Sequence, residues 1–321
     1  HYAETYFLLS ALSYPFIGLY NAGAALFRAQ GNSKISMLSS LVMNVVNIGG
    51  NAVLIYHFHM GVMGAALASL VSRMIACFAV IYLLEKPSCM LRIDRLADLK
   101  PDLSLIRRIL RVGIPAGIEN GMFQIGKLSV SSLTSTLGTA AIAANAVANT
   151  TTTFLNIPAN AVGMAALTVV GQCLGAGEKE QAVYYSRRLL LTAYCGAWVM
   201  NLSAFFFANR FAVSLFNLSP EAQTMALQVM VWFNFVSLFF WPSSFTLPNI
   251  LRAAGDATFT MTVSVFSMWV FRVAFCYLMV LGFHQTHLLS IWGGMFLDWV
   301  FRSLFFAIRF SKGSWLEKKV I

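Results

Sequence analysis

The stretch Phe27-Arg28-Ala29-Gln30-Gly31-Asn32 returns later in the chain as Leu251-Arg252-Ala253-Ala254-Gly255-Asp256. In each copy an arginine is followed three residues later by a glycine, and the motif separates two long apolar segments. Further along, Arg73 is matched by Arg302 at an offset of 229 residues, against 224 for the motif arginines. The chain therefore contains one module twice, which is typical of membrane proteins built from parallel repeats.

Composition places the chain in a lipid bilayer. Hydrophobic residues make up 58% of the sequence and charged residues 11%, and the mean hydropathy is +0.71. These values exclude an ordinary soluble domain. About 20 apolar residues cross about 30 Å of hydrocarbon. We therefore predict an all-α polytopic membrane protein with nine membrane-spanning helices, near 5–27, 35–57, 61–84, 107–136, 141–173, 187–209, 222–250, 259–282 and 288–310.

The net charge of +10 indicates topology rather than a nucleic-acid partner, because the basic residues gather at alternate connections between the predicted spans. By the positive-inside rule these connections and the C-terminus are cytoplasmic. Nine spans then put His1 outside. Only 27 residues precede Arg28, whereas three and a half apolar segments, beginning near Ser104, precede Arg252. We therefore expect the C-terminal portion of a longer protein, with a partial first lobe of three helices at 1–84, a cytoplasmic linker at 85–106, and a complete six-helix lobe with a cytoplasmic tail at 107–321.

Prolines and arginines mark candidate gating positions. Pro15 in the first predicted span and Pro115 in the fourth each remove a backbone hydrogen bond and kink a helix, either as a fixed packing feature or as a hinge. Arg28 and Arg252 stand at cytoplasmic helix ends. Each either ends a helix with a snorkelling side chain or ties two helix ends together during a conformational cycle. The sequence leaves both interpretations open.

Amide side chains form two polar stripes. Asn44, Asn47 and Asn51 follow a helical spacing in the second span, and such residues in lipid face either protein or water. Interhelical hydrogen bonding and the lining of an aqueous cavity both remain open for them. A longer stripe in the fifth span stays within about 80° on one helix face. It predicts a substrate cavity lined by Asn145, Asn149, Thr152, Asn156 and Asn160.

The fourth predicted span carries the candidate ion-coupling residue. Glu119 lies deep in this span, four residues after Pro115, where an unpaired carboxylate is strongly disfavoured. We therefore predict that Glu119 is a proton or cation site, with Gln124 and Lys127 as cavity residues on the same span. A structural pairing of Glu119 with Lys127 is the alternative. Glycines four residues apart also predict a groove that admits another helix closely, at Gly113, Gly117 and Gly121.

The last predicted span contains a second candidate acid. Asp298 and Arg302 are four residues apart, so the spacing favours a local buried ion pair in which Arg302 is structural. The alternative is that Asp298 is released to a coupling ion when the helix moves. No metal site is expected, because His57, His59, His284 and His287 lack the spacing of a ligand set. The sequence has no nucleotide-binding loop, no Ser-His-Asp set and no HExxH motif, so we do not expect an enzyme.

Further stretches carry a family resemblance: Tyr14-Pro15-Phe16, Met43-Asn44-Val45-Val46-Asn47, Gly61-Val62-Met63-Gly64-Ala65-Ala66, Gly113-Ile114-Pro115 and Ala144-Asn145. With the two arginine motifs, the chain resembles the multidrug and toxic compound extrusion (MATE) family of antiporters over essentially its whole length. The resemblance implies two six-helix lobes, a central cavity, and export coupled to inward Na⁺ or H⁺. One branch of the family uses an aspartate on the tenth helix, but residues 222–250 contain no membrane-embedded acid. The coupling ion therefore stays open.

We expect a secondary active antiporter that exports amphipathic organic cations in exchange for Na⁺ or H⁺, with no cofactor besides the coupling ion. The alternatives are a flippase of the same superfamily that moves a lipid-linked precursor, and a transport-inactive fragment. The expected setting is the cell (inner) membrane, which the protein crosses several times as a monomer. The expected partners are membrane lipids and organic cations, and no nucleic acid.

Overall fold

The structure is a computed structural model that describes residues 2–86, 102–208, 214–216 and 218–317. Within these ranges all regular structure is helical. The chain divides into two compact units, 1–101 and 102–321, and each has a hydrophobic core of its own. The division falls inside the predicted linker at 85–106, most of which, 87–101, lies outside the described residues. The predicted lobe boundaries stay a prediction.

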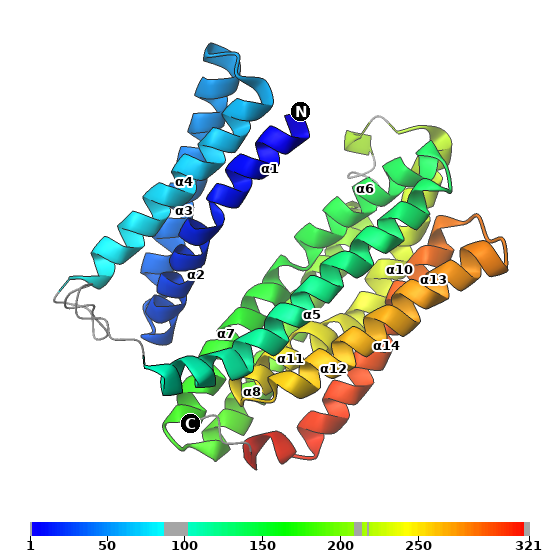
Figure 1. The fold of residues 1–321 in the computed structure, drawn as a ribbon. Helices are drawn as coiled ribbons and strands as arrows, with labels where there is room; N and C mark the ends of the chain where they lie inside the picture. The colour runs from blue at the N-terminus through cyan, green and yellow to red at the C-terminus, as the bar shows by residue number, and fades with distance from the viewer. Residues whose placement is uncertain (1, 87–101, 209–213, 217, 318–321) are drawn as a thin grey trace. The chain divides into compact units, whose positions relative to one another are not determined.

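In the 1–101 unit, α1 (Tyr2–Leu12) and α2 (Tyr14–Ala29) follow one another, α3 (Ser33–Ala52) ends in the π-helical turn η1 (Val53–His57), and α4 (Gly61–Leu84) returns beside α3 (Figure 1). The break at Ser13 follows from Pro15, which has no backbone N–H to donate to the preceding turn. The Ser13 hydroxyl instead donates to the Ser10 carbonyl at 2.6 Å. The predicted kink at Pro15 is therefore a boundary between two helices.

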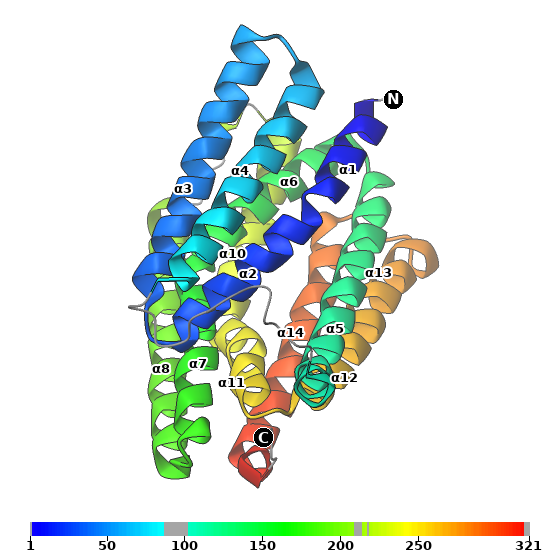
Figure 2. The same ribbon diagram turned by 60° about the vertical axis from the view of Figure 1, so that its left-hand side comes forward.

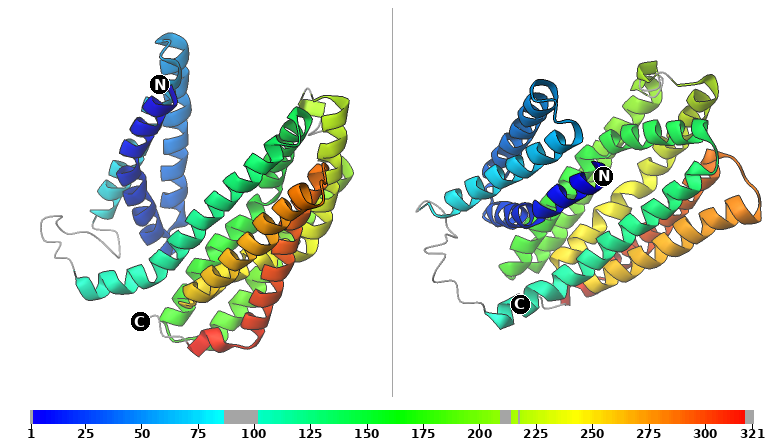
Figure 3. Two further views of the ribbon diagram at one scale, coloured as in Figure 1. Left: turned by 45° about the vertical axis from the view of Figure 1, so that its right-hand side comes forward. Right: turned by 45° about the horizontal axis from the view of Figure 1, so that its top comes forward.

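The 102–321 unit begins with α5 (Leu103–Ser135), which runs along the length of this unit (Figure 3). Asp102 caps α5, because its Oδ1 accepts the backbone N–H groups of Ser104 at 2.8 Å and Leu105 at 3.3 Å. Hydrogen bonds from the Ser104 side chain and from the Leu105 and Ser104 backbones hold the pKa of Asp102 below its usual value. The helix continues through Pro115 without a break.

The rest of the 102–321 unit is a bundle around α10 and α14, and α7 lies beside α8 (Figure 2). Phe233, Trp292 and Trp299 pack edge to face in its core. Its elements are α6 (Thr139–Leu155), α7 (Ile157–Gly175), α8 (Lys179–Ser203), η3 (Ala204–Ala208), α10 (Pro220–Phe245), α11 (Leu247–Ala253), α12 (Ala257–Ser267), η4 (Met268–Ala274), α13 (Phe275–Tyr277), η5 (Leu278–Gly282), α14 (Leu288–Ser311) and η6 (Ser314–Glu317).

The predicted membrane fold is confirmed: seven helical stretches of the described residues are long and apolar enough to cross a bilayer. Each overlaps one of the nine predicted spans. The other two predicted spans, 5–27 and 107–136, are helical as well. The first is divided at Ser13 into helices of 11 and 16 residues, each shorter than a membrane-spanning helix. The second is less apolar, because it contains five charged side chains, at Arg107, Arg108, Arg111, Glu119 and Lys127.

The prediction of one continuous helix across the fifth span was wrong. The segment 141–173 is divided between α6 and α7, with Asn156 in a turn between them. Pro158 explains the break, because proline is tolerated in the first turn of a helix but not in its interior. The five residues of the stripe therefore do not lie on one continuous helix, because Asn156 lies in the turn and Asn160 in the first turn of a second helix.

The predicted close helix approach at the glycine stripe of α5 does not occur within the 102–321 unit. A methyl group built at Gly113, Gly117 or Gly121 meets no described atom within 4 Å. The close approach lies one turn further along instead, because a methyl group at Gly126 would come 2.5 Å from Cε of Met268. The three glycines recur at a spacing of four as predicted, but the neighbouring helix packs against a different side of α5.

The two motif copies adopt the same local conformation. Gly31 and Gly255 have φ angles of +77° and +82°, which only glycine adopts without strain. In both copies the glycine N–H donates to the arginine carbonyl at 2.9 Å. The side chain of Arg28 then donates to Ser36 Oγ at 2.9 Å, and Arg252 donates to Thr260 Oγ1 at 3.4 Å, each eight residues on. The sequence repeat is therefore a structural repeat at this turn.

The repeat extends to the connection after the next helix. That helix ends in a π-helical turn in both units, η1 at His57 and η5 at Gly282. Two residues later, His59 and His284 have φ angles of 53° and 51°, which are uncommon outside glycine.

Within the described residues no group of three or more His, Cys, Asp or Glu side chains is arranged to hold a metal ion.

Candidate functional site

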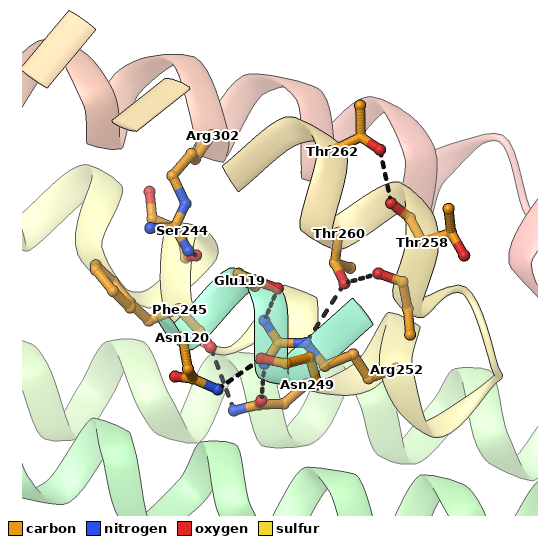
Figure 4. A network of polar contacts seen from close by, with 12 residues as sticks. Glu119, Asn120, Ser244, Phe245, Asn249, Arg252, Thr258, Thr260, Thr262 and Arg302 are labelled. Carbon is orange, nitrogen blue, oxygen red and sulfur yellow. Dashed lines mark hydrogen bonds and ion pairs between the residues drawn. The ribbon is translucent and has the colours of Figure 1, made fainter. Parts of the chain in front are cut away.

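Glu119 and Arg252 form an ion pair between α5 and α11. The Glu119 side chain is almost fully buried, with 4% of the residue exposed. Its Oε2 lies 2.6 Å from Nη2 of Arg252 (Figure 4). The alternative prediction, a pairing of Glu119 with Lys127, is therefore wrong. The predicted coupling acid on α5 therefore pairs with the arginine of the repeated motif, for which the sequence predicted a gating role and no contact with Glu119.

Arg252 connects three helices through its side chain (Figure 4). Besides Glu119 on α5, it donates from Nη1 to Asn249 Oδ1 at 3.1 Å and from Nε to Thr260 Oγ1 at 3.4 Å. Asn249 lies on α11 and Thr260 on α12, so the guanidinium spans the turn between these two helices. An arginine with five donors in a planar fork suits such a junction, because it satisfies several acceptors at fixed angles.

Arg302 on α14 lies beside this pair in an aromatic setting. It is 2% exposed, and its Nη2 donates to the backbone carbonyl of Ser244 at 3.2 Å. Its guanidinium carbon lies 4.7 Å from the ring centroid of Phe245 and 5.2 Å from that of Phe123. Its Nε and Nη1 donate to no acceptor among the described residues. The charge is therefore held by ring faces and one carbonyl rather than by a carboxylate.

Asp298 does not form the predicted ion pair with Arg302. Its Oδ1 accepts the hydroxyl of Ser267 on α12 at 2.6 Å, and its Oδ2 lies 4.0 Å from Nη1 of Arg272 on η4. The spacing of four puts Asp298 and Arg302 on one side of α14, but their side chains diverge. Arg302 reaches towards Ser244 near the end of α10, whereas Asp298 reaches towards α12 and η4. The predicted ion pair between Asp298 and Arg302 was therefore wrong.

A pocket of ≈ 360 Å³ opens on the 102–321 unit. It joins two residues predicted from the amide stripe, Asn145 and Asn149 on α6, to Lys127 on α5. Asn145 Oδ1 accepts Nε1–H of Trp292 at 3.0 Å and the amide of Asn149 at 3.0 Å, so the stripe is tied to α14. The remaining lining side chains are Val130, Ser131, Thr134, Thr153, Arg272, Ile291, Trp292 and Met295.

Four other predicted cavity residues of this unit do not line the pocket. Thr152 is buried and donates its hydroxyl to the Asn149 backbone carbonyl at 3.1 Å. Gln124 is exposed on α5, one turn before Lys127. Asn156 and Asn160 lie beyond the helix break, at the turn and in the first turns of α7. A lining formed by α5, α6, η4 and α14 therefore replaces the predicted ladder along one helix.

In the 1–101 unit, Asn47 and Arg73 each form hydrogen bonds between helices. Asn47 donates to Ser69 Oγ at 3.2 Å and accepts from Asn51 at 3.1 Å, which is the interhelical alternative between α3 and α4. Asn44 is exposed on α3. Arg73 on α4 donates to the Ser13 hydroxyl, at the break between α1 and α2. Arg73 and its repeat partner Arg302 thus each bind near an interruption of a preceding helix.

Sequence reasoning missed Arg272, Ser267 and Trp292 as site residues. Each acts through a partner on a distant helix, since 31 residues separate Ser267 from Asp298 and 147 separate Trp292 from Asn145. The presence of Arg272 in an apolar span was a usable signal, because a charged residue at membrane depth lines a cavity or meets a partner. No spacing rule points to the other two.

The sequence profile of the family described as MatE matches residues 115–278, half of the chain, including Glu119, Arg252 and most of the pocket. The chain belongs to the MATE family. Members of this family are transporters, and the chain is a membrane protein with several spans. Coverage by the profile begins at Pro115, so it includes the acid and the arginine that form the ion pair.

Curated relatives match across both units. The chain is 27% identical over 305 residues to "Probable multidrug resistance protein NorM" of Thermotoga maritima, and the match covers 93% of this chain and 64% of the relative. It is 25% identical over 303 residues to "Probable multidrug resistance protein YoeA" of Bacillus subtilis, covering 92% and 64%. The chain thus spans just under two thirds of the length of these MATE relatives.

Solved MATE structures share the fold. A crystal structure of a MATE protein in complex with MaL6 has a TM-score of 0.83 at 23% identity, covering 98% of this chain and 70% of that one. A MATE protein in the bent conformation has a TM-score of 0.82 at 22% identity, with the same coverage. At these identities the likeness concerns the fold.

Proposed function

We propose that the full-length protein is a secondary active antiporter that exports amphipathic organic compounds in exchange for inward Na⁺ or H⁺. The names of the curated relatives, probable multidrug resistance proteins, support export of organic compounds. The coupling ion is the only cofactor in this proposal. The setting is the cell membrane, with the C-terminus in the cytoplasm and a monomer as the working unit.

The observation that carries the proposal is the buried pair of Glu119 and Arg252, 2.6 Å apart. A carboxylate that is almost fully buried in a membrane protein is functional more often than structural, because the protein must offset the cost of its burial. Here the compensating charge belongs to the repeated motif, at the junction of α11 and α12. A change in the charge of Glu119 therefore acts directly on the contact between three helices.

Coupling follows from competition for Glu119. When Na⁺ or H⁺ occupies the carboxylate, its attraction to Arg252 is lost, and the guanidinium keeps only its hydrogen bonds to Asn249 and Thr260. The contact of α5 with the α11–α12 junction then loosens. The protein thus has one arrangement with the Glu119–Arg252 pair and one without it. Because the cation binds Glu119 only when the pair is broken, its binding shifts the population towards the unpaired arrangement. Release of the cation restores the pair.

Asp298 has a different part in this scheme. Its two oxygens face Ser267 and Arg272, and the residue is completely buried. It lies 4.0 Å from Arg272 at the edge of the pocket and keeps Ser267 as its hydrogen-bond partner, whereas Glu119 exchanges its partner. The substitution of one acid therefore affects coupling and that of the other affects the pocket.

Dye efflux from cells tests the proposal. Cells expressing the full-length protein are loaded with ethidium, a cation, or with fluorescein, an anion, so that the outcome does not depend on substrate charge. We expect at least one dye to leave faster than from control cells, and an ionophore that collapses the Na⁺ and H⁺ gradients to remove the difference. Equal efflux with and without the gradients contradicts ion coupling.

The matched variants are Glu119→Gln and Glu180→Gln. The first keeps the size of the side chain at the proposed coupling site and removes its charge. The second makes the same change at an exposed position in the first turn of α8. We expect Glu119→Gln to abolish gradient-dependent efflux at an unchanged expression level, and Glu180→Gln to retain it.

A further inference from the structure

The pocket of the 102–321 unit is basic. Two cationic side chains, Lys127 and Arg272, line it together with amides, hydroxyls and apolar groups, and no aspartate or glutamate is among the lining residues. Its volume of ≈ 360 Å³ lies within the range of small-molecule sites. A charged pocket of this size in an apolar protein selects its ligand by sign, because opposite charges attract strongly where water is partly excluded.

The two cationic groups gather around one aromatic ring. Nζ of Lys127 lies 5.9 Å from the ring centroid of Phe123, and the guanidinium carbon of Arg272 lies 5.8 Å from it. No carboxylate of the described residues lies within ion-pair distance of Lys127. Lys127 is also exposed at the pocket, so its ammonium is available to a ligand.

The carboxylate nearest to Arg272 does not reach the pocket. Asp298 lies 4.0 Å from Nη1 of Arg272, but the residue is 0% exposed and does not line the pocket. Its other oxygen is engaged by Ser267 at 2.6 Å. A ligand that enters the pocket therefore meets the two cations, while the acid lies behind them. The Nη2 group of Arg272 donates to Met295 Sδ at 3.1 Å. This arrangement opposes the binding of an organic cation, which was the sequence-based expectation.

The rest of the lining fits an amphipathic molecule. Ile291, Met295 and Val130 supply apolar surface. The side-chain oxygen of Asn145, Oδ1, already accepts hydrogen bonds from Trp292 and Asn149, so it does not offer a free acceptor to a cationic ligand. The available electrostatic interactions at this surface thus favour an anionic group on a partly apolar body.

We propose that this pocket binds the anionic group of an amphipathic organic solute, a carboxylate or sulfonate, between Lys127 and Arg272. The inference rests on the proposed transport function only in that it makes such a solute the exported substrate. The binding event itself requires no gradient. Charge-assisted hydrogen bonds from an ammonium and a guanidinium orient the group, and the apolar side chains contact the remainder of the molecule.

Binding of two matched dyes to the purified full-length protein tests the proposal. Rhodamine 110 carries a free carboxylate, and rhodamine 123 is its methyl ester, with the same ring system. Fluorescence anisotropy without any ion gradient gives a dissociation constant for each dye. We expect the acid to bind about tenfold more tightly than the ester, as one charge-assisted contact is worth about this factor.

Variants separate a direct contact from a structural effect. Lys127→Gln is expected to weaken binding of the acid about tenfold and to leave the ester unchanged. Arg272→Lys keeps the charge beside Asp298 and changes the geometry of the donors, so it should weaken the acid more than the ester. Lys312→Gln makes the same change as Lys127→Gln at an exposed position just beyond α14 and should alter neither constant.

Equal or tighter binding of the ester by the wild-type protein overturns the proposal. So does a Lys127→Gln variant that weakens both dyes by the same factor, because that result indicates altered packing rather than a lost charge contact. A preference for the acid in a protein that shows no gradient-dependent efflux supports the anion site and refutes the antiport function. The two proposals are thus tested separately.

Discussion

Replacement of Arg252 by glutamine leaves Glu119 as a buried carboxylate without its cationic partner. At a separation of 2.6 Å the gross attraction of two unit charges is about 6 kcal/mol for an effective dielectric constant of about 20. Desolvation of the two groups offsets much of this attraction in the wild-type protein. Removal of one partner alone, however, exposes the full cost of the buried charge, about 3–5 kcal/mol. We expect Arg252→Gln to lower the free energy of unfolding by this amount.

A double-mutant cycle isolates the pair. In Arg252→Gln/Glu119→Gln the uncompensated charge is absent, so the double variant should be more stable than Arg252→Gln alone by about 2 kcal/mol or more. The measurement is equilibrium unfolding of the full-length protein in mixed detergent micelles. Arg28→Gln is the matched control, because the arginine of the first motif copy loses only a hydrogen bond to Ser36, worth about 2 kcal/mol.

Two results would refute the reasoning. One is an Arg252→Gln variant that is no less stable than Arg28→Gln. The other is a double variant whose loss equals the sum of the two single losses, since additivity means that Glu119 and Arg252 do not interact energetically.

Further predictions concern packing, the motif turn and metals. Gly126→Ala should be less stable than Gly117→Ala by about 1 kcal/mol, because its methyl group would lie 3.2 Å from Cγ of the buried Met268, whereas the methyl group at Gly117 meets no described atom within 4 Å. The same unfolding assay checks both. Gly255→Ala should cost about 1–2 kcal/mol at its φ of +82°, and equal stability would mean that the turn relaxes without strain. Chelators of divalent and transition metals should leave dye efflux unchanged, and inhibition restored by added metal would contradict this.

Much of the fold followed from local signals. The motif turn was predictable because glycine at a positive φ and the preceding arginine lie within four residues of each other. The all-α membrane class followed from apolar length alone. Pro158 also carried a visible signal for the break between α6 and α7, since proline is disfavoured inside a helix, but the regular amide spacing across it suggested one continuous face.

The candidate site was predictable in its members and not in its contacts. Glu119, Arg252, Lys127 and Asn145 were each recognisable as polar residues in apolar spans. Their partners depend on how helices far apart in sequence pack. The separation of Glu119 from Arg252 in the chain offers no periodic pattern, and the local spacing of Asp298 and Arg302 suggested a contact that the tertiary structure does not form.

The central claim is that Glu119 couples cation entry to export, and ion flux measures it most directly. The full-length protein is reconstituted in liposomes, and Na⁺ and H⁺ movement is followed with ion-sensitive dyes after an exported dye is added. The account predicts substrate-dependent flux of one cation in the wild-type protein and in Glu180→Gln, and none in Glu119→Gln. Wild-type flux in Glu119→Gln, together with its loss in Asp298→Asn, would contradict the account and move the coupling site to α14.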